Sequence, residues 1–200
     1  MTYSEKHLNE VRQIIESIDG YVIAANKNSP KMTVIAGDTP SVKAVMRRFE
    51  GLDIDCVVLQ TSHAFHSSIV EPAAEPLRRF LEGLEINLPE IPITSNVDGE
   101  FYPMSRDPER TAKQQVLDKL VPQMASAVEW TKQIETMYAS GARLFIEVGP
   151  KRALTMFASQ ILDGKPHISM MTNHPKFGGI PSLFNALAEM AIAGRPYRWP

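Results

Sequence analysis

His63 and His66 are the residues whose types and spacing best suit chemistry, and they flank Ala64-Phe65 directly after a predicted strand. Histidine is the usual general base near neutral pH. A loop at the end of a strand is held by the sheet, so it suits an active-site residue. Two surface or capping histidines would give the same pattern. Metal binding is disfavoured because no third ligand lies near them in the sequence, whereas catalytic zinc takes three protein ligands.

A histidine base needs a nucleophile to activate, and the sequence offers no convincing one. It contains no Gly-x-Ser-x-Gly elbow, no Walker-type phosphate loop and no Gly-x-Gly-x-x-Gly. Cys56 lies in a predicted buried strand and is interpreted as a small core residue. Ser67 and Ser68 adjoin His66, but a hydroxyl next in sequence rarely faces the neighbouring ring. The residues alone therefore indicate a candidate base without its nucleophile.

The elements that must position this base are predicted from hydrophobic periodicity. The first part contains helical spacing up to residue 18, two strands joined by a short turn, a helix and a third strand. These elements are expected at residues 4–20, 21–25, 32–36, 40–50 and 56–59, with turn chemistry at 26–30 and Ser4 as the first N-cap. The order is most of a ferredoxin-like βαββαβ unit, whose first strand is missing or reduced to Met1-Thr2-Tyr3.

The second part of the chain predicts an α/β layer. A capping box of Ser126 and Glu129 opens one helix, and the apolar run 144–148 is typical of a strand buried on both faces. The expected elements are a helix at 69–84, a short strand at 91–95, a loop at 98–110, and helices at 113–120, 126–141, 154–162 and 182–193.

Composition limits the class of protein. The chain has 200 residues, of which 44% are hydrophobic and 22% charged, enough for a buried core. A formal charge of −2 argues against a nucleic-acid binder. No apolar run approaches the ~20 residues of a membrane helix, and the residues after Met1 are polar, unlike a signal peptide. The single cysteine excludes an intrachain disulfide. We expect a cytoplasmic globular protein that contacts neither nucleic acid nor membrane.

Six motifs that follow one another along the chain carry a family resemblance. They are NKNSP followed by TVIAG (26–37), SHAFHS then EP (62–72), SNVDG (95–99), VEW (128–130), FIEVGP (145–150) and AGRPYRW (193–199). Together they resemble malonyl-CoA:acyl carrier protein transacylases, especially the acyltransferase domains of polyketide synthases and polyunsaturated fatty acid synthases. The sequence departs from the family pattern at Ser68 and Ala127, where the family has proline.

The resemblance implies ping-pong acyl transfer with no cofactor and no metal. A serine in Gly-His-Ser-x-Gly would take a malonyl unit from malonyl-CoA, His66 would be the catalytic base, and the phosphopantetheine thiol of an acyl carrier protein would be the acceptor. In the family the serine, its oxyanion amides and the carboxylate-binding arginine precede this segment. The N-terminal, nucleophile-bearing part of the domain would therefore be a partner, and this chain alone is expected to be inactive.

The resemblance also assigns supporting roles. His63, Phe65 and Asn28 would bind substrate, and Phe65 would favour malonyl over methylmalonyl by narrowing the space for a methyl group. Asn96 would help to hold the loop beside His66, although a plain turn role is open for Asn28 and Asn96. The backbone carbonyl of Glu129 would orient the histidine, while its side chain caps its own helix.

These inferences predict an α/β fold in three parts. Residues 1–61 would form a ferredoxin-like small subdomain with a truncated first strand, residues 62–172 the C-terminal part of an α/β-hydrolase-like acyltransferase core, and residues 173–200 a linker that follows the domain. The open sheet edges predict association with another chain, such as a homo-oligomer. A non-catalytic module that docks a carrier protein is the alternative function.

Overall fold

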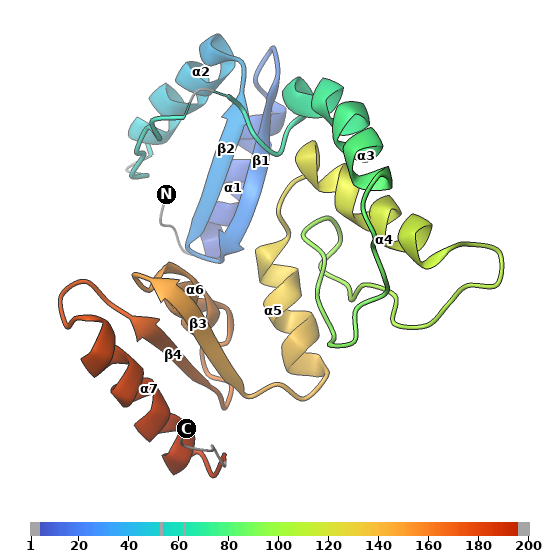
Figure 1. The fold of residues 1–200 in the computed structure, drawn as a ribbon. Coiled ribbons are helices and arrows are strands. Elements are labelled where there is room, and N and C mark those ends of the chain that lie inside the picture. Colours follow the sequence, from blue (N-terminus) through green and yellow to red (C-terminus); the bar gives the residue numbers. More distant parts are fainter. Residues whose placement is uncertain (1–4, 53, 62, 196–200) are drawn as a thin grey trace. The chain divides into compact units, whose positions relative to one another are not determined.

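The computed structural model describes residues 5–52, 54–61 and 63–195 (Figure 1). Four sequence predictions lie outside these residues: the Met1–Tyr3 strand, the Ser4 cap, Ser62 of the histidine motif and the linker residues beyond 195. The chain divides into two compact units, Met1–Thr136 and Met137–Pro200.

The first unit begins with the predicted helix, hairpin and helix. These are α1 (Glu5–Glu16), β1 (Val22–Ser29), β2 (Met32–Gly37) and α2 (Thr39–Glu50). β1 and β2 pair antiparallel, with Val22 opposite Gly37, which confirms the predicted hairpin. The turn is shorter than predicted, because residues 26–29 continue the strand and only Pro30 and Lys31 separate it from β2.

Asp38 joins the hairpin to α2. Its carboxylate accepts hydrogen bonds from Ser41 N at 2.9 Å, Ser41 Oγ at 2.9 Å and Tyr21 N at 2.8 Å. These bonds, those from the backbone of Ser41 and Tyr21 first, lower the pKa of Asp38. The capped helix, with Pro40 at its start, then turns Val45 and Phe49 inward.

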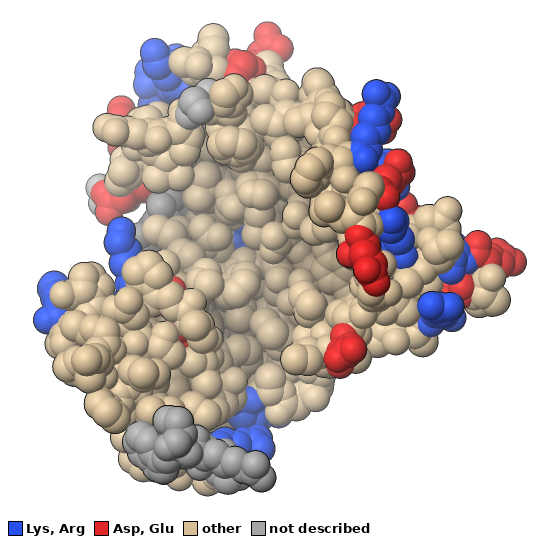
Figure 2. All heavy atoms as spheres, in the orientation of Figure 1, with Lys and Arg blue, Asp and Glu red and all other residues tan. Residues whose placement is uncertain are grey.

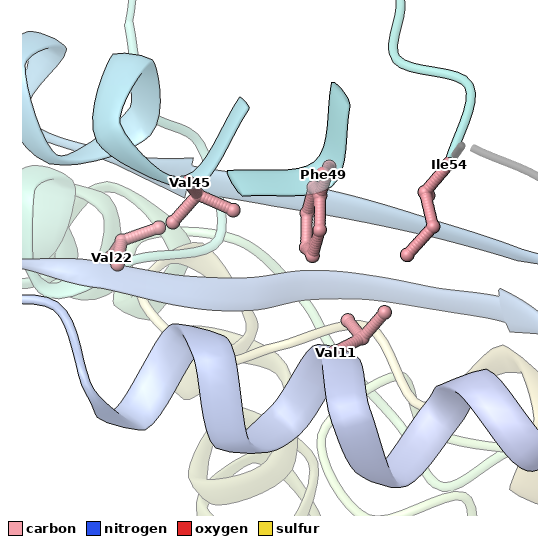
Figure 3. Packing of buried hydrophobic residues seen from close by; sticks show 5 residues of the cluster. All are labelled: Val11, Val22, Val45, Phe49 and Ile54. Atoms are coloured by element: carbon pink, nitrogen blue, oxygen red, sulfur yellow. The ribbon is translucent and has the colours of Figure 1, made fainter. Parts of the chain in front are cut away.

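A small apolar core holds these elements together. Val11 of α1, Val22 of β1, Val45 and Phe49 of α2 and Ile54 form one buried cluster (Figure 3). Phe49 and Val45 are fully buried. The helical and strand periodicities of the sequence therefore meet in one core, as the hydrophobic pattern predicts.

The predicted strand at 56–59 is wrong. Residues 54–60 follow α2 without forming a helix or strand, and Val57 and Val58 are 81% and 68% exposed. Only Ile54 and Cys56 of this segment contact the core cluster. A strand forms by pairing, and in the described part of the chain β2 pairs with β1 alone. The apolar run has no neighbouring strand to join, so the ferredoxin-like assignment remains a prediction.

The rest of the first unit carries helices separated by an irregular stretch at residues 83–111. It contains the 3-10 helix η1 (Ser68–Ala73), α3 (Ala74–Glu82), α4 (Ala112–Leu120), the 3-10 helix η2 (Val121–Met124) and α5 (Trp130–Ala139), which continues into the second unit. Proline inside η1 gives the predicted 69–84 helix its 3-10 start. The predicted strand at 91–95 is only a single bridge between Thr94 and Phe101.

The predicted capping box of Ser126 and Glu129 is wrong, because α5 begins at Trp130. Ser126 instead closes a turn by donating its backbone N–H to the Pro122 carbonyl at 3.0 Å. A capping box is present on α4, where Thr111 and Gln114 satisfy each other's backbone N–H groups.

The second unit is an α/β layer, as predicted. β3 (Leu144–Pro150) and β4 (Ile168–Asn173) pair in parallel, α6 (Ala153–Ile161) connects them, and α7 (Gly179–Ile192) follows. The expectation that β3 is buried on both faces is wrong. Ile146 is 38% and Val148 85% exposed, although Met170, the partner of Ile146 on β4, is buried. No helix among the described residues combines the length and apolar character needed to cross a bilayer.

Replacing Phe49 by alanine tests the core of the first unit. Phe49 is fully buried in the cluster, so Phe49→Ala should lower the free energy of unfolding by about 3–5 kcal/mol in chemical denaturation. Phe80→Ala removes the same atoms from a side chain that is 67% exposed. This control should lower the free energy of unfolding far less. Equal losses in the two variants would contradict the core assignment.

The capping bonds of Asp38 predict an acid-linked loss of stability. A carboxyl whose pKa is lowered in the folded state stabilises the fold above its unfolded pKa of about 3.9, and this contribution disappears as the pH falls through the folded value. The unfolding free energy of the wild type should therefore fall more steeply than that of Asp38→Asn as the pH is lowered from about 5 to below about 3.9. Asp163→Asn, on an exposed residue of the other unit, should behave as the wild type does. If the unfolding free energies of wild type and Asp38→Asn depended identically on pH, the Asp38 cap would not contribute to stability.

Candidate functional site

His66 lies in a strained turn just before η1. Its φ is 61°, in the left-handed region, and Lys151 is the only other non-glycine residue with positive φ among the described residues. Such a conformation costs about 1–3 kcal/mol and persists only where the surroundings enforce it, which is common at active sites. The turn around His66 should therefore be held by specific contacts.

Two hydrogen bonds hold the backbone on either side of His66. Ser67, which is fully buried, donates its hydroxyl to the carbonyl of Ala64. The next amide, Ser68 N, donates to the phenol oxygen of Tyr21 at 2.8 Å. The backbone of His66 is thus held by a local turn and by a contact from Tyr21, which directly precedes β1.

The imidazole ring is held from another direction. His66 Nδ1 lies 3.0 Å from the backbone carbonyl oxygen of Gln123, in η2. A carbonyl only accepts hydrogen bonds, so this contact places the proton of the neutral ring on Nδ1. Nε2 is then the unprotonated nitrogen, which is the form that a general base requires.

The expectation that the Glu129 carbonyl orients the histidine is therefore wrong. Gln123 supplies that carbonyl, and the Glu129 carbonyl accepts instead from Gln133 N at 3.0 Å, within α5. The side chain of Glu129 is 10% exposed and forms an ion pair with Lys27 of β1. Lys132 Nζ lies 3.8 Å from its other oxygen. Glu129 therefore ties α5 to β1.

Asn28 lies at an irregularity of β1. The pairing register shifts between Lys27 and Ser29, so Asn28 is the extra residue of a bulge rather than part of the turn. Bulges redirect a side chain and are frequent near active sites. The same strand is fixed from outside the hairpin, since Lys27 N donates to the Val128 carbonyl at 2.9 Å. The turn role considered for Asn28 is wrong, and its substrate role stays a prediction.

Asn96 connects its own turn to α5. Its carbonyl accepts from Glu129 N at 2.9 Å, and its side-chain oxygen accepts from Gln133 Nε2 at 2.8 Å. Gln133 is buried and also accepts from the Thr94 hydroxyl at 2.9 Å. Asn96 lies in a turn, and its hydrogen bonds with Glu129 and Gln133 connect this turn to α5. Its support of the His66 loop stays a prediction.

The remaining candidates are exposed or chemically quiet. The rings of His63 and Phe65 lie 6.0 Å apart between centroids, and Phe65 is 52% exposed.

Desolvation raises the pKa of the Cys56 thiol, which keeps it protonated and supports its interpretation as a core residue rather than a nucleophile. The described residues contain no group of three or more His, Cys, Asp or Glu side chains that could hold a metal ion. In the view of Figure 2, charged side chains of both signs lie mostly along the edges of the drawn face and are not gathered by sign.

Sequence reasoning missed Gln123 and Tyr21. The carbonyl that orients His66 belongs to the backbone, so the residue type at 123 carries no signal of it. Tyr21 contacts the turn from 47 positions away in the sequence. The only available signal was Pro122, which lies in the first turn of η2 shortly after α4 ends at Leu120.

Comparisons with known proteins place this geometry in a family context. No family model matches the chain. It is 31% identical over 173 residues to a polyunsaturated fatty acid synthase polypeptide of Thraustochytrium sp., a match that covers 84% of this chain and 6% of that protein. It is 31% identical over 150 residues to malonyl CoA-acyl carrier protein transacylase of Escherichia coli K12, covering 74% of this chain and 46% of that protein. The chain thus spans about half of that transacylase.

Solved structures agree with these relatives. The acyltransferase domain from the second module of the salinomycin polyketide synthase superimposes with a TM-score of 0.77 at 25% identity, covering 95% of this chain and 42% of that one. A malonyl-transacylase solved in complex with a type II polyketide synthase acyl carrier protein superimposes with a TM-score of 0.75 at 25% identity, covering 90% and 55%. The chain is therefore a homologue of malonyl-CoA:acyl carrier protein transacylases and of polyketide and polyunsaturated fatty acid synthase acyltransferase domains, and it corresponds to the C-terminal part of that domain.

Proposed function

We propose that this chain carries the general base of an acyltransferase that moves a malonyl-type unit from coenzyme A to the phosphopantetheine thiol of an acyl carrier protein. The observation that carries the proposal is the contact of His66 Nδ1 with the Gln123 carbonyl, combined with a left-handed backbone at His66. A surface histidine needs neither feature. The names of the relatives support the reaction class.

In the first half-reaction, His66 Nε2 takes the proton of a serine hydroxyl supplied from outside this chain. The serine oxygen forms a bond to the thioester carbonyl carbon, the carbon–sulfur bond breaks, and the proton passes from His66 to the departing coenzyme A thiolate. In the second half, Nε2 takes the proton of the carrier thiol and the thiol sulfur forms a bond to the acyl carbon. The ester bond between that carbon and the serine oxygen breaks, and the proton passes from His66 to the serine oxygen. One base serves both halves because an imidazole that has taken up a proton as a general base can release it again as a general acid.

The nucleophile belongs to a second polypeptide segment in this proposal. The sequence has no serine elbow, and Cys56 stays a thiol. The exposure of Ile146 and Val148 on a parallel strand supports a further segment that covers this face, because such strands are normally buried on both sides. Residues 1–61 would act as the small subdomain, 62–172 as the C-terminal part of the core and 173–200 as the linker after it.

The carrier protein and the acyl unit complete the proposal. One related transacylase was solved with its carrier protein bound, which supports the same kind of partner here. Phe65, with His63 beside it and Asn28 in the β1 bulge, would face the acyl unit. Phe65 is half exposed, so it is available to contact a bound acyl chain.

Replacing His66 tests the proposed base. The chain alone should take no covalent label from radiolabelled malonyl-CoA, whereas addition of a homologous segment that bears Gly-His-Ser-x-Gly should produce labelled acyl-enzyme and carrier. His66→Gln should slow the transfer to the carrier by about 10²–10⁴-fold. His167→Gln is the matched control, because His167 Nδ1 also contacts a backbone carbonyl, that of Lys165, in the other unit.

Two outcomes would contradict this proposal. A stable label on the chain alone would show that it carries a nucleophile. Unchanged transfer in His66→Gln, with carrier binding retained, would favour the alternative of a non-catalytic docking module.

Replacing Phe65 tests the choice of acyl unit. Phe65→Ser removes the ring proposed to narrow the space beside the malonyl α-carbon. The ratio of kcat/KM for methylmalonyl-CoA to that for malonyl-CoA should rise by at least about tenfold, since one methyl group is worth about 10–200-fold in discrimination. Phe80→Ser, on an exposed face of α3, should leave the ratio as it is. A ratio that does not move in Phe65→Ser would remove Phe65 from the acyl pocket.

A further inference from the structure

Tyr21 is a fixed point of the first unit. Its backbone N–H donates to Asp38 Oδ2 at 2.8 Å, and its carbonyl accepts from Asp38 N at 2.9 Å. Glycines permit this close approach: a Cβ on Gly37 would lie 2.1 Å from the Tyr21 carbonyl oxygen, and Gly20 has a φ of +112°. The backbone of Tyr21 is therefore held on both sides before its side chain makes any contact.

From this fixed backbone the phenol reaches the first residue of η1. The Tyr21 hydroxyl oxygen accepts the backbone N–H of Ser68 at 2.8 Å. The first N–H groups of a helix have no partner inside it. The phenol oxygen supplies that partner here, and a phenylalanine could not.

Ser68 differs from the motif that this segment resembles, in which proline follows His-Ser. A proline has no N–H and fixes its own φ, so it holds the start of a helix without an acceptor. Serine at this position has a backbone N–H that needs an acceptor, and its φ is not fixed by a ring. Tyr21 restores by a hydrogen bond the restraint that a proline ring would provide.

The restrained amide lies two residues after the strained histidine. Ser67 lies between them, is fully buried and donates a hydrogen bond to Ala64. A restraint on the Ser68 amide therefore also restrains the backbone of His66. The Gln123 carbonyl fixes the imidazole ring, whereas Tyr21 fixes the backbone that bears it. The two restraints come from different elements and act on different parts of the same residue.

We infer that Tyr21 is a positioning residue for His66, and that it acts through the Ser68 amide. The inference rests on the proposed function only for its catalytic consequence. Without the phenol acceptor, the turn gains freedom to relax from the left-handed conformation. Nε2 then spends less time in the orientation that reaches the nucleophile.

Tyr21→Phe in the full chain tests this inference without any need for activity. The Cε1–Hε1 NMR signal of His66, assigned by its absence in His66→Gln, should shift or broaden. Amide exchange at Ser68 should accelerate by about two- to tenfold, as expected for the loss of one hydrogen bond. Tyr138→Phe removes the same atom in the other unit and should leave both readouts unchanged. An unchanged His66 signal and Ser68 exchange in Tyr21→Phe would overturn the inference.

Ser68→Pro gives a second, independent arm. The backbone at Ser67, with φ −138° and ψ 164°, already has the extended conformation that a residue before proline requires. Proline at 68 removes the donor and should itself restrain the turn, so adding Tyr21→Phe to Ser68→Pro should not change the His66 signal further. A second change of the same size as in the single variant would show that Tyr21 acts elsewhere.

The reconstituted enzyme provides the catalytic readout. Tyr21→Phe should lower kcat by about two- to tenfold with KM for malonyl-CoA unchanged, and Ser68→Pro should remove this dependence. If no variant transfers acyl groups, the proposed function fails while the NMR comparison still decides the role of Tyr21. If transfer occurs but Tyr21→Phe changes neither kcat nor the His66 signal, the inference about Tyr21 is wrong and the proposed function stands.

Discussion

The contact between the His66 ring and the Gln123 carbonyl is the interaction on which the site depends. It sets the tautomer and the direction of the ring at once, and it needs η2 to lie beside the turn before η1. η2 and the turn before η1 together hold this one imidazole. Since a backbone oxygen does the orienting, the arrangement is set by the path of the chain, and a side-chain substitution at 123 leaves the acceptor in place.

A second set of contacts fixes β1, the strand that carries the Asn28 bulge. The buried Glu129 carboxylate pairs with Lys27, and the backbone bond from Lys27 to Val128 runs alongside. A charge so little exposed is stable only with a partner, so the ion pair and the backbone bond support each other. Asn96 and Gln133 extend the same support to the next loop. The bulge at Asn28 is thereby held against the start of α5 rather than free at a hairpin end.

Local sequence pattern was sufficient for much of this architecture and failed at identifiable points. The hairpin, α2, β3 and α7 follow from periodicity and capping, which are properties of short segments. Residues 56–59 show the limit, because their apolar pattern does not reveal whether a neighbouring strand exists. At the site, His66 could be found from its residue type and motif. Gln123 acts through its backbone, and Tyr21, directly before β1, is 47 positions away from the turn that it contacts, so neither could be found from local signals.

The left-handed backbone at residue 66 has a consequence for how this position tolerates change. Glycine would adopt a φ of 61° without strain, and asparagine adopts it more readily than most residues. Selection for stability alone would therefore favour glycine or asparagine over histidine at position 66. With the proposed role of His66 as a base, folding and chemistry favour different amino acids at this position. Variants selected only for thermal stability would be expected to lose the imidazole first at this position.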